Sequence, residues 1–227
     1  MKLEVRRRPV RYARLEVRPD GTVVVTAPEG FGVEGFIDRH RRWLEAKLAE
    51  IDGLREIAES GFPVDGEFYT VVRGRKTKVH ERFKTVVLSA YRDEAISGLK
   101  AFLRPRLLPL VGEYSQKMNV TPGKVFIRHQ RSRWGSCSAK GNLNFNVRLV
   151  SVPPGLREYV VVHELAHLRF PNHSKAFWEF VGRFYPGWRS AREELRKWWS
   201  IIELNPHWRW LGGESEELPE IAGPDGR

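Results

Sequence analysis

The stretch VVVHELAHLRFPNHSKAFW, residues 160–178, determines how the rest of the chain is interpreted. Within it, His163 and His167 are four positions apart, and Glu164 directly follows the first histidine. Residues four apart lie on the same face of an α-helix, so the two imidazoles can bind one divalent metal ion. The glutamate then lies close to a water on that ion and can accept its proton. This spacing is typical of zinc-dependent hydrolases.

The residues around the motif predict a buried helix. Apolar side chains recur at helical spacing from Glu158 to Phe170, and Val160 and Val161 add an apolar flank. Two histidines and a carboxylate in such a helix would be costly to desolvate without a partner. A bound metal ion would be such a partner. The structural alternative is a pair of core histidines satisfied by hydrogen bonds.

A third ligand is expected just after the helix. Pro171 should end the helix, and Asn172 suits a turn that brings His173 back beneath the metal. Ser174 is a good N-cap for the next helix. Three protein ligands would leave the fourth position open, as in catalytic zinc sites. Two alternatives are a His173 without any special role and a third ligand supplied by Glu179.

A second informative segment, RSRWGSCSAKGNLNFN at residues 131–146, precedes the motif. Residues 139–142 form a turn signal, and the strand after them alternates apolar and polar side chains. The segment therefore predicts a hairpin whose second strand is half buried.

Taken in order, residues 131–146 and 159–178 resemble the YgjP-like metallopeptidase family, a relative of the SprT-type proteases within the zincin group. In that family a Trp-Gly-Ser-Cys segment and an Asn-containing strand precede the metal helix, and an Asn-His-Ser step supplies the third ligand. The matching positions here are Trp134–Cys137, Asn146 and His173. The resemblance is strong over about residues 90–200 and looser before them.

The resemblance implies an α+β fold, with a zincin-like metallopeptidase domain whose small sheet packs on the active-site helix and on further helices. It also implies one zinc ion as cofactor and a polypeptide substrate. In the predicted mechanism, zinc held by His163, His167 and His173 lowers the pKa of a water and polarises the scissile carbonyl. Glu164 takes the proton from that water and passes it to the leaving amine.

The Trp134–Cys137 segment resembles the edge strand along which zincin substrates lie by strand addition. On this interpretation Arg133 and Trp134 line a substrate groove, and Gly135 permits a close approach of the backbone. The alternative is a tight turn with a core tryptophan and a small buried cysteine. Asn146 either hydrogen-bonds to the site or faces solvent.

Three further residues near the motifs are considered for chemical roles: Cys137, Arg133 and Tyr185. Cys137 is disfavoured as a ligand or nucleophile, because three histidines already suffice. Arg133 and Tyr185 are the candidates for stabilising the oxyanion that develops during peptide hydrolysis.

The chain divides into three predicted parts. Residues 1–89 form a β-rich region with one long helix, residues 90–204 the metallopeptidase domain, and residues 205–227 an acidic, flexible tail. Within the first part we expect a hairpin around residues 19–21, a helix over 34–59, and a second hairpin joining 68–73 to 76–80 around Gly74. A helix should begin at Asp93 and kink or restart at Pro105.

Composition constrains the class of protein. The 227 residues are 41% hydrophobic and include one cysteine, so an intrachain disulfide framework is excluded. No apolar run suits a signal peptide or a membrane span, so we expect a soluble, cytoplasmic protein.

The net charge of +11 is concentrated around the motif, since residues 101–199 carry 17 basic and 6 acidic side chains. The alternative function is therefore a nucleic-acid-associated module, or a protease acting on DNA-bound protein, through this basic surface. A merely solubilising surface is the simpler explanation.

Overall fold

The computed structural model describes residues 2–18, 20–216 and 218–219 and has a mixed α+β fold, as predicted. The strands are β1 (Lys2–Arg7), β2 (Arg14–Val17), β3 (Thr22–Ala27), β4 (Phe62–Val64), β5 (Glu67–Gly74), β6 (Lys78–His80), β7 (Thr85–Ser89), β8 (Val125–Arg128), β9 (Gly135–Cys137) and β10 (Leu143–Asn146). The helices are α1 (Val33–Arg39), α2 (Arg41–Glu59), α3 (Arg92–Met118), α4 (Pro154–Ala166), α5 (Lys175–Phe184), α6 (Trp188–Leu204) and α7 (Pro206–Leu211), with short 3-10 turns at Glu81–Phe83 and Val147–Val150. None of the described helices could span a membrane.

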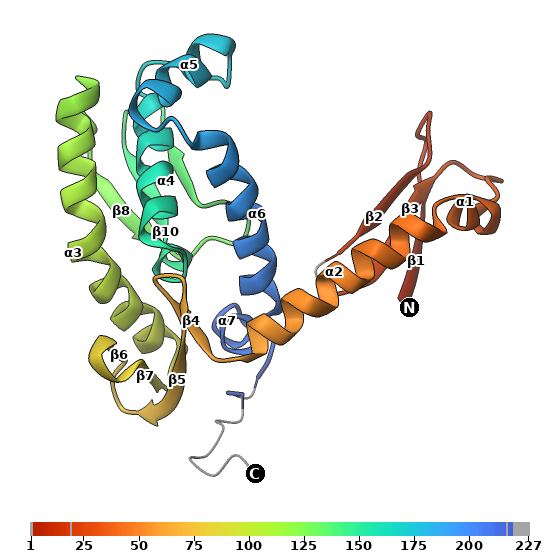
Figure 1. Cartoon of the computed structure of the whole chain (residues 1–227), viewed down its shortest axis with the longest axis horizontal. Coiled ribbons are helices and arrows are strands. Elements are labelled where there is room, and N and C mark those ends of the chain that lie inside the picture. The colour runs from red at the N-terminus through yellow and green to blue at the C-terminus, as the bar shows by residue number, and fades with distance from the viewer. Residues whose placement is uncertain (1, 19, 217, 220–227) are drawn as a thin grey trace.

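The N-terminal sheet has the order β1-β3-β2. Strands β2 and β3 form the predicted antiparallel hairpin, and β1 adds to β3 in parallel. In Figure 1 this sheet and α1 stand away from the main body, and α2 connects them to it.

The helix predicted over residues 34–59 is interrupted once. Its two parts, α1 and α2, meet at His40, whose backbone leaves the helical conformation at φ −107° and ψ 9°. An apolar stripe with helical periodicity lies on α2, where Leu44, Ile51 and Ala58 are buried. The C-terminal end of α2 packs against α6, which anchors the N-terminal module.

The hairpin predicted to join residues 68–73 and 76–80 is wrong. The sheet has the order β4-β5-β7-β6, so β7 lies between the two segments that were expected to pair. Strand β7 runs parallel to β5 and antiparallel to β6. Segment 67–74 therefore pairs with β7, a strand further along the chain, and does not form the hairpin that Gly74 suggested.

A hairpin that the sequence analysis missed joins β4 to β5 through Asp65 and Gly66. Both residues have positive φ, 50° and 88°, as the two-residue turns of twisted hairpins require. The Asp-Gly pair was the available sequence signal. A side chain at position 66 would also collide with Pro153, since a Cβ there would lie 2.8 Å from its Cγ.

Helix α3 passes through Pro105 and Pro109 as one element. Each proline removes a backbone hydrogen bond at a cost of roughly 3 kcal/mol. The continuous buried stripe of Leu99, Leu103 and Leu107 spans the first proline and offsets this cost. The predicted restart at Pro105 is therefore wrong, and a kink there stays a prediction.

The third sheet, in the order β8-β10-β9, packs with α4 and positions the histidine motif. The predicted hairpin is present as antiparallel β9 and β10, with β8 parallel to β10. Leu143, Phe145 and the buried face of α4 belong to one hydrophobic cluster with α3, α5 and α6.

The core crosses the predicted boundary at residue 89. A second cluster joins Phe62 and Leu88 of the β4–β7 sheet to Leu99 of α3 and Trp208 of α7. The flexible tail predicted from residue 205 is wrong for its first residues, because Pro206–Leu211 form helix α7. Its Trp208 is fully buried and donates a hydrogen bond to Ser151 at 2.8 Å. The tail residues 217 and 220–227 lie outside the described residues.

Candidate metal centre

Three histidines converge at the C-terminal end of α4. His163 lies in the last turn of the helix, His167 caps it, and His173 precedes α5. One nitrogen from each ring lies within 4.8 Å of the others, and the Nε2 atoms of His163 and His173 are 3.1 Å apart. Two nitrogens bound to one tetrahedral zinc ion are about 3.3 Å apart. The arrangement of the three rings therefore fits a shared metal ion.

In His163 and His167, Nδ1 has a partner outside the cluster, which leaves Nε2 to face the shared site. The Nδ1 of His167 lies 3.1 Å from the carbonyl oxygen of Phe170, and the Nδ1 of His163 lies 3.4 Å from the hydroxyl of Tyr159. A ring that donates through Nδ1 presents the lone pair of Nε2 to a metal.

The turn after α4 makes the contact of His167 with Phe170 available. The helix was expected to continue to Phe170, but it ends at Ala166 and the chain then turns. Because of this turn, the carbonyl of Phe170 comes back towards the ring of His167. Ser174 then caps α5 as predicted, accepting a hydrogen bond from the backbone N–H of Phe177 at 3.3 Å.

The environment of His163 keeps its imidazole ring unprotonated. Burial, with further contributions from His167 and His173, lowers the pKa of His163 to about 3. Its imidazole is therefore neutral near pH 7. A neutral imidazole is the form that binds zinc.

Aromatic side chains of α5 form the wall behind the histidines. Phe177 is fully buried, and its ring centroid lies 4.7–5.0 Å from those of His163, His167 and His173. Trp178 stacks on His173 with centroids 5.5 Å apart. Neither residue was among the predicted site residues, so their contact with the histidines is new.

Glu164 faces the site from inside the protein. It is only 5% exposed, and its Oε2 has no hydrogen-bond partner among the described residues. Burial raises the pKa of its carboxyl to about 8, against a smaller lowering by the charge of Arg133. An unpartnered carboxyl beside three imidazole rings is suited to a nearby cation, which would favour its charged form.

Gly135 and Glu164 are in close contact. A Cβ built on Gly135 would lie 2.6 Å from Oε1 and 2.7 Å from Cγ of Glu164. The sequence suggested that Gly135 permits a close approach, and the group that approaches it is the carboxylate. An alanine here would have to displace that group.

An open cavity of about 920 Å³ lies along β9 and over the histidines. Its lining includes Arg133, Gly135 and Cys137 from the β9 segment, together with Glu164 and the three histidines. Strand β9 is the edge strand of its sheet, so this cavity borders an unpaired strand edge.

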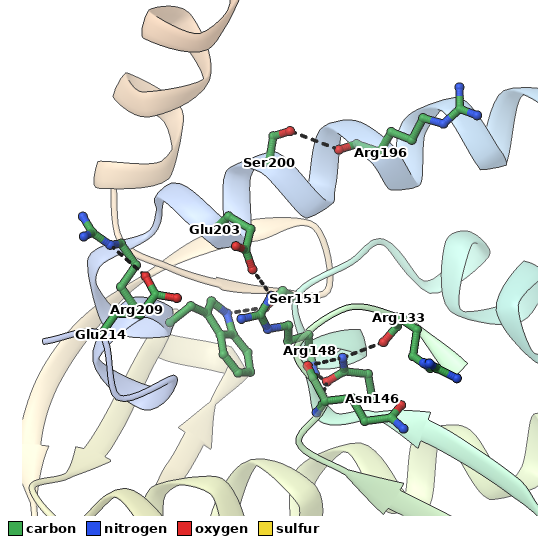
Figure 2. A network of polar contacts seen from close by, with 11 residues as sticks. Arg133, Asn146, Arg148, Ser151, Arg196, Ser200, Glu203, Arg209 and Glu214 are labelled. Carbon is green, nitrogen blue, oxygen red and sulfur yellow. Dashed lines mark hydrogen bonds and ion pairs between the residues drawn. The ribbon is translucent and has the colours of Figure 1, made fainter. Parts of the chain in front are cut away.

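Asn146 supports the groove from beneath it. The residue is fully buried, so it does not face solvent. Its Nδ2 donates to the carbonyl oxygens of Arg133 at 2.7 Å and Gln130 at 2.8 Å, and its Oδ1 accepts from the backbone N–H of Arg148 at 3.1 Å. Figure 2 shows this network, in which Arg148 also pairs with Glu203. Asn146 therefore holds the loop before β9 and lies beneath the groove, not in its lining.

Trp134 lies beside the site. It is half-buried against Trp199, with ring centroids 4.9 Å apart, and lines a second cavity next to the histidines. Cys137 is half-buried, and burial raises the pKa of its thiol, which disfavours a nucleophilic thiolate.

The two remaining candidates lie away from the histidines. Glu179 pairs with Lys175 at 3.7 Å and is not part of the histidine cluster in the described chain. Tyr185 is missing from the described residues that line the two cavities beside the histidines.

Comparisons with known proteins identify the family of the chain. The model of the family described as "YgjP-like, metallopeptidase domain" matches residues 11–198. A curated relative, the UTP pyrophosphatase of Escherichia coli (strain K12), is 27% identical over 93 residues, which cover 40% of this chain and 56% of the relative.

Two solved structures, both of metallopeptidase zymogens, are also similar. Abylysin of Pyrococcus abyssi is 27% identical with a TM-score of 0.35, and the match covers 38% of this chain and 86% of that one. Jannalysin of Methanocaldococcus jannaschii is 19% identical with a TM-score of 0.37, and the match covers 40% and 94%.

Because the family model spans most of the sequence, the chain belongs to the YgjP-like metallopeptidase family. The resemblance inferred from residues 131–146 and 159–178 is thereby confirmed. Zinc as the metal, the roles of the individual site residues and nucleic-acid binding remain predictions.

Proposed function

We propose that this protein is a zinc-dependent metallopeptidase in which Glu164 is the general base. The observation that carries the proposal is the open edge of β9 directly beside Glu164 and the three histidines. An extended peptide added to that edge would place its backbone at the site.

The hydrogen-bond pattern of β9 supports this mode of binding. The N–H of Ser138 bonds to the carbonyl of Asn142, and the carbonyl of Trp134 accepts from Asn146. Alternate residues of an antiparallel strand bond to the same partner, so the backbone groups of Gly135 and Cys137 point away from β10. Those groups are free to pair with a substrate strand.

When bound by His163, His167 and His173, zinc would supply Lewis acidity and lower the pKa of a water towards ~7. The chain's own contribution centres on Glu164. Its carboxylate accepts a proton from the attacking water and delivers it to the leaving amine. Gly135 lets this carboxylate lie against β9, close to the peptide bond of an added strand.

The test is Glu164→Gln, compared with Glu179→Gln on the exposed surface of α5. We expect Glu164→Gln to keep its zinc, because the three histidines are unchanged, and to lose peptide hydrolysis by roughly 10²–10⁴-fold. Glu179→Gln should keep both zinc and activity. A Glu164→Gln protein that cleaves a peptide library at the parental rate would contradict the proposed base.

A second candidate function is hydrolysis of a nucleoside triphosphate to the monophosphate and pyrophosphate. The named activity of the Escherichia coli relative raises it, and Arg133 and Arg192 beside the histidines favour it, since guanidinium groups bind phosphate well. Incubation with UTP and detection of pyrophosphate distinguishes it from peptide cleavage.

A further inference from the structure

A second cavity, of about 410 Å³, lies next to the histidines. It shares Arg133, Gly135, His163 and Glu164 with the larger cavity along β9. Its other walls come from α4 and α6. A group bound here would therefore lie beside the reacting bond.

Three arginines surround this cavity. Arg192 and Arg196 are one turn apart on α6, and Arg133 comes from the loop before β9. The ion pairs found in the described part of the chain involve other arginines, such as Arg148 with Glu203 and Arg157 with Asp65. All three arginines thus line the cavity without one of those ion pairs, although the charge of Arg133 also acts on the carboxyl of Glu164.

The position of Arg192 relative to the histidines is fixed by aromatic contacts. Its guanidinium carbon lies 5.2 Å from the ring centroid of Trp178. Trp178 in turn stacks on His173, which ties this arginine to the metal-binding group. A cation over an aromatic face is held in place while its N–H groups stay available.

The floor of the cavity is apolar and aromatic. Trp134 packs edge-to-face on Trp199, and the buried residues Tyr159, Val160 and Leu195 complete the lining. An apolar floor beneath three cationic groups suits a ligand with an apolar or planar body and an anionic end.

The direction of β9 indicates which part of a bound peptide would enter this second cavity. A peptide that adds antiparallel to β9 runs towards the N-terminal end of that strand. That end carries Ser132 and Arg133, which line the three-arginine cavity. For a substrate in this antiparallel orientation, the cavity accepts the part on the C-terminal side of the scissile bond.

We propose that the cavity bounded by Arg133, Arg192 and Arg196 is a subsite for an anionic group, carboxylate or phosphate, on the leaving-group side of the bond. The proposal rests on the hydrolytic function proposed above and narrows its substrates to molecules with such an anion. A guanidinium group can bind either oxyanion through charge-assisted, bidentate hydrogen bonds.

The test variant is the double substitution Arg192→Gln/Arg196→Gln. The matched control is Arg189→Gln/Lys197→Gln, which removes the same charge from exposed positions of α6 outside the cavity lining. The probes are one peptide with a free C-terminal carboxylate, the same peptide as its C-terminal amide, inorganic pyrophosphate and UTP. Calorimetry measures affinity, and hydrolysis is assayed separately.

For the wild-type protein and the control pair, we expect an anionic probe to bind at least 10-fold more tightly than the amide. The cavity variant should lose that preference and keep its affinity for the amide. Preference for the carboxylate peptide would identify a peptide anion, and preference for UTP and pyrophosphate a phosphate.

Equal affinity for acid and amide, no binding of any anionic probe, or an equal loss in the control pair would overturn the subsite. Arginine-dependent binding without hydrolysis of any probe would instead support the subsite and count against the proposed function. The two ideas are therefore tested separately.

Discussion

The carboxylate of Glu164 lies against the backbone of Gly135, so close that a Cβ on the glycine would stand 2.6 Å from its Oε1. The active-site helix and the edge strand thus meet at these two residues. A base placed there is near both the histidine nitrogens and any strand added to β9. The geometry of this contact leads to the first prediction.

Gly135→Ala should reduce hydrolysis by roughly 10–100-fold while zinc binding is retained. The added methyl group displaces Glu164 by an ångström or so, and such misplacement of a catalytic group costs about this much. Activity and zinc content are the measurements. Gly112→Ala is the control, since a Cβ there meets no atom within 4 Å. Full activity in Gly135→Ala would show that the contact does not position the base.

His173→Ala should weaken zinc binding by more than the roughly 10–100-fold that loss of an outer-shell partner costs, because one of three direct protein ligands is lost. His173 is exposed, so the free energy of unfolding of the metal-free protein, measured with a chelator present, should change little. Competition with a zinc-binding dye measures the affinity. His80→Ala, at another exposed histidine, is the control. Unchanged affinity would remove His173 from the ligand set and reopen the search for a third ligand.

Asn146→Asp should destabilise the protein by about 2–4 kcal/mol, more than Asn146→Ala. The native amide donates to the carbonyls of Arg133 and Gln130, whereas a buried carboxylate has no hydrogen to donate and leaves a charge uncompensated. Urea unfolding of the metal-free protein, with a chelator present, measures the change in free energy of unfolding.

The control for Asn146 is Asn144→Asp, two residues earlier on β10. Asn144 is only part-buried, and the side-chain hydrogen bond that it makes in the described part of the chain, to Ser136 Oγ, is long at 3.5 Å. Asn144→Asp should therefore lower the free energy of unfolding much less than Asn146→Asp. Equal costs at the two positions would argue against a special role of Asn146 in holding the loop.

Acidification should destabilise the fold through His207. The residue is 6% exposed, and burial lowers its pKa from 6.5 to about 4. Between these values the unfolded chain takes up a proton that the folded chain does not, so stability falls as the pH drops through this range. At pH 5 the loss attributable to His207 is about 1–2 kcal/mol.

The measurement is the difference in free energy of unfolding between pH 7.5 and pH 5 with a chelator present. His207→Gln should reduce this difference, and His80→Gln at an exposed position should leave it unchanged. An identical pH dependence in His207→Gln and the parent would rule out His207 as its source.

The sequence predicted the elements whose signals are local. The β2–β3 hairpin follows from a turn between alternating strands, and the stripe of α2 follows from helical periodicity. The Ser174 cap follows from its place before an apolar helix. In each case the deciding interactions join residues a few positions apart.

The failures involve partners far apart in the chain. Strand β7 entered between β5 and β6 because strand pairing depends on a whole sheet. Helix α7 is ordered because Trp208 fills a core made by α3 and the β4–β7 sheet. In the sequence, the turn signal at Gly74 was stronger than any local sign that β7 would pair with β5. The polar composition of the C-terminus likewise outweighed any local sign of α7.

By itself, the sequence determined the family and predicted the candidate chemistry, which consists of three histidine ligands and an adjacent carboxylate, from spacing within two short segments. Only the tertiary structure decided what surrounds that chemistry. It placed Gly135 against Glu164, buried Asn146 beneath the groove and brought Arg192 of α6 beside the histidines. These contacts join separate elements, and their positions follow from packing around a shared core, which no local spacing records.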